Sequence, residues 1–440
     1  MKSKILIGFC VFSILPVVIF AQSNDLSPKV TRNRIITNPT PSPSPTPARK
    51  IVVVKDNLPA PTPTPTRTPT QQPAATPITQ TPTAVETAVP TTTTPSQPIF
   101  YKPLSFREIK KKIAEAKRQM SGRPVQTAIT DDYLQTEVVR LAFYDYADAK
   151  VDYAVMTKDA FLSRDAQMGL TTDNGKFIMV RIIRANGVNT PVMITDTQNR
   201  VQMPLLVQYP VVRNGVYIET AYYISTHTGI VTPEVVSAGR LYVRNTIDAA
   251  RENLKKKAII ISPEVTDMAE RLSVVEHVDH LRFRTESHPV IFNDIFALYA
   301  LNEGQTYRYS VSSAGAGGMV QMIPATYRMI RSRYFNVNLM PDFVEGMRNH
   351  INASTAMLLY MQMTWDDLIA SNTIYDAIEN GVATPAELMS AGYNSNPARL
   401  AGYIKRGGTN WRNLIPRETQ IYLQINASMD KYVPVSPRSK

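Results

Sequence analysis

A single carboxylate followed by a run of small residues is the part of this sequence where chemistry is most readily recognised. Glu303 ends the apolar segment PVIFNDIFALYALNEG, and the run SSAGAGGMVQMIPAT begins nine positions later at Ser312. We expect a buried helix that ends at Glu303, with Gly304 as its stop signal. Phe296 and Tyr299 would desolvate the carboxyl group, and the helix dipole would also favour its protonated form, which is typical of a general acid. A helix-terminal Glu that reaches solvent is the competing interpretation.

The residues after Glu303 favour a ligand rich in hydroxyl and amide groups. Glycines allow the backbone of a loop to approach a ligand closely. Gln321 offers both a donor and an acceptor, which suits an acetamido or hydroxyl group of a sugar. The GAGG stretch is a poor match to a phosphate-binding loop, because no strand precedes it and no lysine follows it.

Four separated blocks resemble the catalytic domain of the soluble lytic transglycosylases, in the goose-lysozyme-like superfamily. That family carries E-S, then S-x-x-G-A-x-G-L-M-Q-x-M-P-x-T, later Y-N-A-G, and finally E-T-x-x-Y. The corresponding blocks here are residues 303–304 (EG), 312–326 (SSAGAGGMVQMIPAT), 393–397 (YNSNP) and 418–422 (ETQIY). Their order and the intervals from Glu to Ser and from Ser to Gln agree, and the resemblance covers about residues 263–435.

The resemblance implies cleavage of the β-1,4 bond between N-acetylmuramic acid and N-acetylglucosamine in peptidoglycan. Glu303 would protonate the leaving oxygen and then accept the proton of the C6 hydroxyl, which attacks C1 and closes a 1,6-anhydro ring. This reaction needs no second carboxylate, cofactor or metal. The resemblance assigns Ser312 and Gln321 to sugar contacts, Tyr393 and Asn394 to the border of the reacting centre, Ile323 to the cleft wall, and Glu418 to an orienting role.

The sequence departs from the family pattern at several of these positions. Gly304 replaces a serine, Val320 and Ile323 stand where methionine is favoured, and Ser395 and Asn396 replace Ala-Gly. These changes bear on rate and subsite preference more than on the type of reaction.

Two other functions stay open. In a muramidase, water would replace the C6 hydroxyl, and Asp366, Asp367 or Glu387 would have to lie at the separation from Glu303 that two-carboxylate mechanisms need. Alternatively, the protein could be a catalytically weak cell-wall-binding or assembly protein that has kept the fold.

Other candidate site residues are weaker. His277 and His280 are three positions apart, but further ligands close in sequence are lacking, so we predict no metal site. Trp365 and Trp411 suit either stacking on sugar rings or packing in a core.

The expected fold class is α+β and multidomain. A mainly α, lysozyme-like catalytic domain is predicted over residues 261–440, because helical patterns start at Ser262-Pro263 and recur at 289–302, 324–333, 349–360, 385–391 and 418–431. Residues 101–260 are predicted to form a β-rich accessory domain, with an amphipathic basic helix at 104–120 and strands between 131 and 228. Residues 22–100 form a Pro/Thr-rich linker whose composition predicts disorder.

The first residues predict export. Lys2 and Lys4 precede an apolar run at residues 5–20, and Ala21 ends a signal-peptide pattern at residues 1–21. Cleavage there would remove Cys10, the only cysteine, and leave 46 basic residues against 36 acidic ones, a net charge of +10. A basic protein of the periplasm or cell envelope suits an anionic polymer.

The expected partners follow from this location. They are peptidoglycan glycan strands and, through the β-rich domain, other cell-envelope proteins. Nucleic acid is not expected, and a membrane is expected only if the signal segment stays uncleaved.

Overall fold

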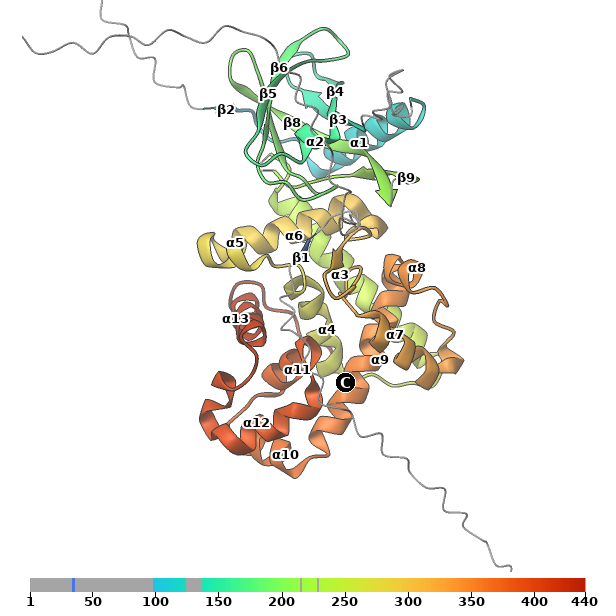
Figure 1. Ribbon diagram of the computed structural model, residues 1–440, viewed down its shortest axis with the longest axis vertical. Coiled ribbons are helices and arrows are strands. Elements are labelled where there is room, and N and C mark those ends of the chain that lie inside the picture. Colours follow the sequence, from blue (N-terminus) through green and yellow to red (C-terminus); the bar gives the residue numbers. More distant parts are fainter. Residues whose placement is uncertain (1–33, 36–97, 124–136, 214–215, 228, 440) are drawn as a thin grey trace, which may run out of the picture.

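The computed structural model describes residues 34–35, 98–123, 137–213, 216–227 and 229–439, so the signal segment and most of the linker lie outside the described residues. It is a mixed helix and sheet protein with a curled antiparallel sheet. Figure 1 shows the sheet at one end and the helices at the other. Within the described ranges, no helix is both long and apolar enough to cross a membrane.

The sheet is organised around one long strand. β8 (Arg200–Arg213) pairs with β7 at its start, with β3 along its middle and with β9 at its end. All three strands therefore share β8 in one curled sheet. The sheet order is β4-β3-β8-β7-β6-β5, with β2 and β9 also paired to β8. These strands are β2 (Ile99–Phe100), β3 (Val138–Asp145), β4 (Lys150–Thr157), β5 (Gln167–Thr171), β6 (Phe177–Ile182), β7 (Val192–Asp196) and β9 (Val216–Tyr223).

The predicted basic helix is present as α1 (Phe106–Ser121). Ser105 and Glu108 form a capping box at its start, which fixes where the helix begins. Ile109, Ala116 and Met120 are buried in a cluster that contains residues of the sheet and of the helix that ends at Asn302. The helix therefore packs where sheet and helices meet, and its lysines face outward.

A long helix that the sequence did not lead us to expect joins the two regions. α3 (Pro233–Lys255) begins at Thr232, whose side chain accepts a hydrogen bond from the backbone of Val235. It packs against α6 (His288–Asn302) and α9 (His350–Ile369). At Gly239 a Cβ atom would lie 1.9 Å from the carbonyl oxygen of Phe296, so only glycine allows the two helices to approach this closely.

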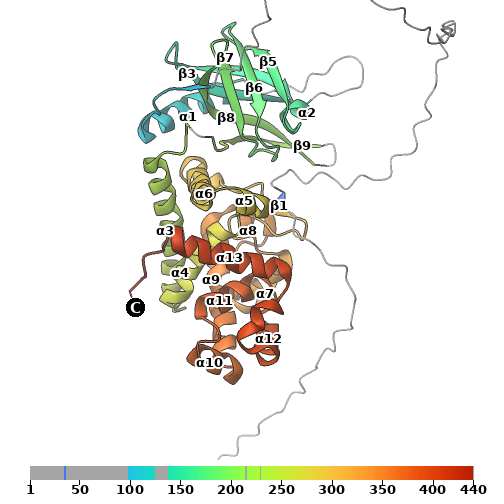
Figure 2. The same cartoon turned by 90° about the vertical axis from the view of Figure 1, so that its left-hand side faces the viewer.

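Most of the remaining helices pack against α9 and lie away from the sheet, whereas α5 and α6 lie next to it (Figures 1 and 2). Close to its end the chain is fixed by Arg438, which is 5% exposed and forms ion pairs with Asp248 of α3 and with Asp267 and Glu270 of α4. These helices are α4 (Pro263–Val275), α5 (His280–Thr285), α7 (Pro324–Arg333), α8 (Phe343–Arg348), α10 (Asn372–Glu379), α11 (Pro385–Asn394), α12 (Leu400–Gly407) and α13 (Arg417–Tyr432); α2 (Lys158–Phe161) lies among the strands.

The end of α6 is attached to the sheet by a pair of hydrogen bonds. The Asn302 side chain accepts one from the backbone N–H of Ile224 (2.8 Å) and donates one to its carbonyl oxygen (2.9 Å). The backbone N–H of Tyr307 donates to the hydroxyl of Tyr223 (3.2 Å). The junction between sheet and helices is therefore a specific polar contact placed one residue before Glu303.

We predict that Asn302→Ala destabilises the protein by about 1–3 kcal/mol, because it leaves two buried backbone groups of Ile224 without partners. Urea unfolding measures the change. Asn380→Ala is the control, since the side chain of Asn380 is exposed and bonds only within its own turn. Equal midpoints for the two variants would contradict the prediction.

Candidate functional site

Glu303 lies at the end of α6, but its side chain is not buried as the sequence suggested. The residue has φ 48°, so the chain leaves the helix in a left-handed conformation. The side chain is 59% exposed, and its Oε1 lies 2.6 Å from Nζ of Lys110, on α1. The expectation of a desolvated carboxyl group is therefore wrong, and the competing interpretation of a Glu that reaches solvent describes the side chain.

A buried histidine holds the turn that follows Glu303. The Thr306 hydroxyl donates to the carbonyl oxygen of Leu298, and the Thr306 carbonyl oxygen lies 2.8 Å from Nε2 of His350. Burial lowers the pKa of His350 to about 4, so its ring is neutral at pH 7. Nε2–H then donates to Thr306, and Nδ1 accepts from the hydroxyl of Tyr242 at 2.8 Å.

Position 304 leaves room for the serine of the family pattern. A Cβ atom on Gly304 would have the hydroxyl of Tyr242 as its nearest neighbour, at 3.9 Å, which is an ordinary contact. The glycine is therefore not required by packing.

The Gly-rich loop is held by the same side chains that were expected to contact sugar. Ser312 Oγ accepts a hydrogen bond from the backbone of Ala316 (3.0 Å), and Gln321 Nε2 donates to Ser310 Oγ (3.1 Å) and to the Gly318 carbonyl oxygen (2.8 Å). Ser312 and Gln321 are each 7% exposed. A Cβ atom on Gly318 would lie 2.2 Å from the backbone of Met347, which explains the glycine there. Both predicted contact residues thus stabilise the loop itself.

The second, third and fourth sequence blocks come together. The Tyr393 hydroxyl donates to the carbonyl oxygen of Val320 (2.6 Å), next to Gln321 in the Gly-rich loop. Asn394 is buried and its Oδ1 accepts from the hydroxyl of Thr419 (2.9 Å). Residues far apart in sequence are thereby joined into one network.

Two further predicted residues border this network. Glu418 is half-buried in the first turn of α13, directly before Thr419. Ile323 is half-buried in the extended residue that precedes α7. The network does not include Glu303, whose side chain bonds to Lys110 instead.

A short strand pair lies beside Ser312. β1 (Arg34–Ile35) runs antiparallel to β10 (Val311–Ser312), with Arg34 opposite Ser312. The backbone of Ser312 is therefore already paired to a segment of the same chain.

Several weaker candidates have structural roles. His277 stacks on Tyr307 with ring centroids 3.3 Å apart, and its Nε2 lies 2.9 Å from the Met319 carbonyl oxygen. Trp411 is completely buried and donates to the Val382 carbonyl oxygen, so it packs in a core and is not placed for sugar stacking. No group of three or more metal-ligating side chains occurs within the described residues.

Two of the carboxylates considered for a two-carboxylate mechanism, Glu387 and Asp366, also have partners. Glu387 caps α11 and forms two hydrogen bonds with Arg412. Burial acts in the opposite direction, but the bonds from Arg412 and Thr384 hold the pKa of Glu387 below its usual value. Asp366 is exposed and accepts a bond from Gln362 on the same helix.

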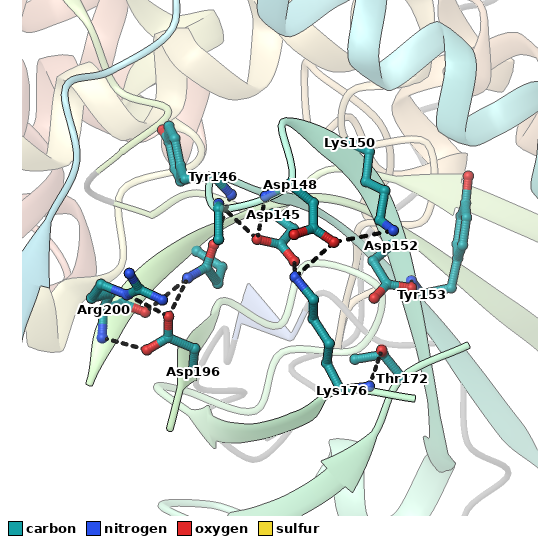
Figure 3. Close-up of polar contacts among 12 residues, drawn as sticks. Asp145, Tyr146, Asp148, Lys150, Asp152, Tyr153, Thr172, Lys176, Asp196 and Arg200 are labelled. Carbon is teal, nitrogen blue, oxygen red and sulfur yellow. Dashed lines mark hydrogen bonds and ion pairs between the residues drawn. The ribbon is translucent and has the colours of Figure 1, made fainter. Parts of the chain in front are cut away.

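A set of ion pairs connects two turns in the sheet region (Figure 3). Lys176 pairs with Asp145 and with Asp148 (2.9 Å), and Asp148 also pairs with Lys150 (3.1 Å). These pairs connect the β3–β4 turn to the β5–β6 turn. Each charge is neutralised by a neighbour, so the cluster is structural.

Lys110 and His350 are the residues of this region that the sequence analysis missed. Lys110 precedes Glu303 by 193 positions, and no motif connects them. His350 stands outside all four blocks and resembles an ordinary helix-start residue.

We predict that His350 makes the protein less stable as the pH falls from 6.5 to about 4. In that window the unfolded chain takes up a proton that the folded state does not, which costs up to about 1.4 kcal/mol per pH unit. His350→Gln removes this term, so the stability of the wild type should fall more steeply than that of the variant. Urea unfolding at a series of pH values measures both slopes, and parallel slopes would contradict the prediction.

Comparisons with known proteins add no relative. A scan against protein-family models finds no match, and neither a search of curated proteins nor a search of solved structures finds a similar chain. The four sequence blocks and the geometry described above are therefore the basis on which a function is proposed.

Proposed function

We propose that this chain is an exported peptidoglycan lytic transglycosylase in which Glu303 acts first as general acid and then as general base. The observation that supports the proposal most strongly is the network that joins the Gly-rich loop, the Tyr-Asn pair and the Glu-Thr pair. These three blocks come from distant parts of the sequence and occur in the order of the family pattern. The remaining block of the family pattern is Glu303, at the end of α6.

The contact with Lys110 occupies the carboxylate of Glu303. Glu303 must give up this contact before it can protonate the leaving oxygen or accept the C6 hydroxyl proton. Both side chains are about half exposed or more, and exposed ion pairs are worth only about 0–1 kcal/mol, so a bound glycan can displace the ammonium group.

The two alternatives differ from this proposal in their products. A muramidase would leave reducing ends, because water attacks C1. A wall-binding protein would retain the polymer without cutting it.

The first prediction concerns the products released from purified peptidoglycan by the full-length protein. We expect muropeptides with 1,6-anhydromuramic ends, lighter by one water than reducing ends, as measured by mass spectrometry. Glu303→Gln should reduce their release by about 10²–10⁴-fold, since it removes the acid–base group. Glu379→Gln, an exposed change on α10, is the control and should leave the rate unchanged.

Each other outcome decides between the alternatives. Reducing ends that depend on Glu303 would indicate a muramidase. Polymer retention without products, equal in wild type and Glu303→Gln, would indicate a binding protein and sink the transglycosylase proposal.

A second prediction tests whether the ion pair between Lys110 and Glu303 slows cleavage. Lys110→Met should raise the cleavage rate by about two- to fivefold, because the glycan no longer has to displace the ammonium group from Glu303. Lys111→Met, an exposed change on the same helix, serves as the control. A loss of activity in Lys110→Met as deep as that of Glu303→Gln would show that Lys110 is itself required for the reaction.

A further inference from the structure

Two adjoining cavities lie between the sheet and helices α5 and α6. The larger has a volume of about 550 Å³ and the smaller about 190 Å³. Arg184, Thr226, Arg282 and Asp294 line both, so the two cavities are neighbours. Neither is lined by any residue assigned above to glycan cleavage.

The larger cavity is a groove with an apolar wall. Phe100, Ile183 and Val290 line it and are respectively 54%, 42% and 50% exposed. Large apolar side chains that stay exposed around a concave surface commonly mark a binding site, and the volume is in the usual range for ligand pockets. Arg181, which is exposed, adds a positive charge to the lining.

Most charges of the smaller cavity are satisfied within the protein. Arg282 donates to Glu286 (2.9 and 2.8 Å) and to Asp294 (2.6 Å). The carboxylate of Asp279 caps α5 by accepting two backbone N–H groups. These groups therefore have their own partners and do not need a ligand.

Arg184 is different. Its guanidinium group is half-buried at the boundary of the two cavities, and among the described residues it has no hydrogen bond or ion pair. Burial and the nearby positive charge of Arg282 lower its pKa, and the carboxylates of Asp279, Glu286 and Asp294 offset this only in part. A guanidinium group carries five N–H donors in a planar fork, and its best partner is a carboxylate or a similar anion.

A hydrogen-bond acceptor without a partner among the described residues belongs to a residue that lines the smaller cavity. Asn189 is 5% exposed, and its Oδ1 is buried without a hydrogen-bond partner within the described part of the chain. An amide N–H of a peptide would supply the missing donor, whereas a fatty acid has no such group. The guanidinium group at the cavity boundary and the unsatisfied acceptor of Asn189 together favour a peptide over a carboxylate-bearing lipid.

We propose that these cavities bind the carboxyl-terminal end of a short, extended peptide with apolar side chains. Arg184 binds the terminal carboxylate, Asn189 accepts a backbone N–H, and the apolar wall of the groove takes the side chains. The smaller cavity is also lined by Ser310, whose hydroxyl accepts the bond from Gln321, so the bound end lies beside the Gly-rich loop. The proposal concerns a different site from Glu303 and does not depend on glycan cleavage.

Affinity selection with mass spectrometry on the full-length protein tests this site. The probes are two pools of acetylated apolar tetrapeptides, one with free carboxyl termini and one amidated, together with dodecanoate and inorganic phosphate. We expect the free-acid pool to be retained at least about tenfold more strongly than the amidated pool. Arg184→Met should abolish that difference, and Arg164→Met, an exposed change in the same sheet region, should not.

A thermal measurement separates loss of binding from loss of folding. Arg184→Met should melt near the wild-type temperature, because it breaks no hydrogen bond or ion pair among the described residues. Peptides from the retained pool should raise the melting temperature of the wild type but not of Arg184→Met. Equal retention of both pools, unchanged retention by Arg184→Met, or displacement of the peptides by dodecanoate or phosphate alone would overturn the proposal.

Discussion

The two hydrogen bonds between Asn302 and Ile224 are the contact on which the arrangement of the candidate site depends. They fix the last residue of α6 to the sheet, and the next residue is Glu303. The same junction brings α1 to the end of α6, because buried residues of both helices share one apolar cluster. The position of the sheet and the surroundings of the candidate acid are therefore set together. A movement of one region relative to the other would change the separation of Lys110 and Glu303.

Close to this junction, polar side chains hold the Gly-rich loop in place. Gln321 uses its amide to hold Ser310 and Gly318, and Ser312 holds Ala316. Because these bonds already order the loop, binding a ligand there would cost little conformational entropy. A glycan lying against this loop would therefore meet a preformed backbone surface.

The sequence predicted those features that depend on local patterns. The amphipathic pattern at residues 104–120 predicted α1, the helical pattern at 324–333 predicted α7, and segments rich in Val, Ile, Tyr and Phe predicted β3 and β6. Strand β5 and helix α3 were not recognised in the sequence, although the apolar residues of α3 from Val235 onward are regularly spaced. Exposure of Glu303 was the competing interpretation of the sequence, but its ion pair could not be predicted, because it depends on a lysine from another region of the chain. The signal segment, the linker and the domain boundary at residue 260 stay predictions.

The ion pairs of Arg438 have a consequence for the order in which the helices pack. Its guanidinium group lies among Asp248, Asp267 and Glu270, three carboxylates on helices that are translated well before it. Arg244 of α3 also pairs with Asp248 (4.0 Å) and Glu270 (3.4 Å), so before Arg438 docks one cation faces three carboxylates, and like charges at close range repel. The contact between α3 and α4 is therefore expected to tighten when Arg438 docks.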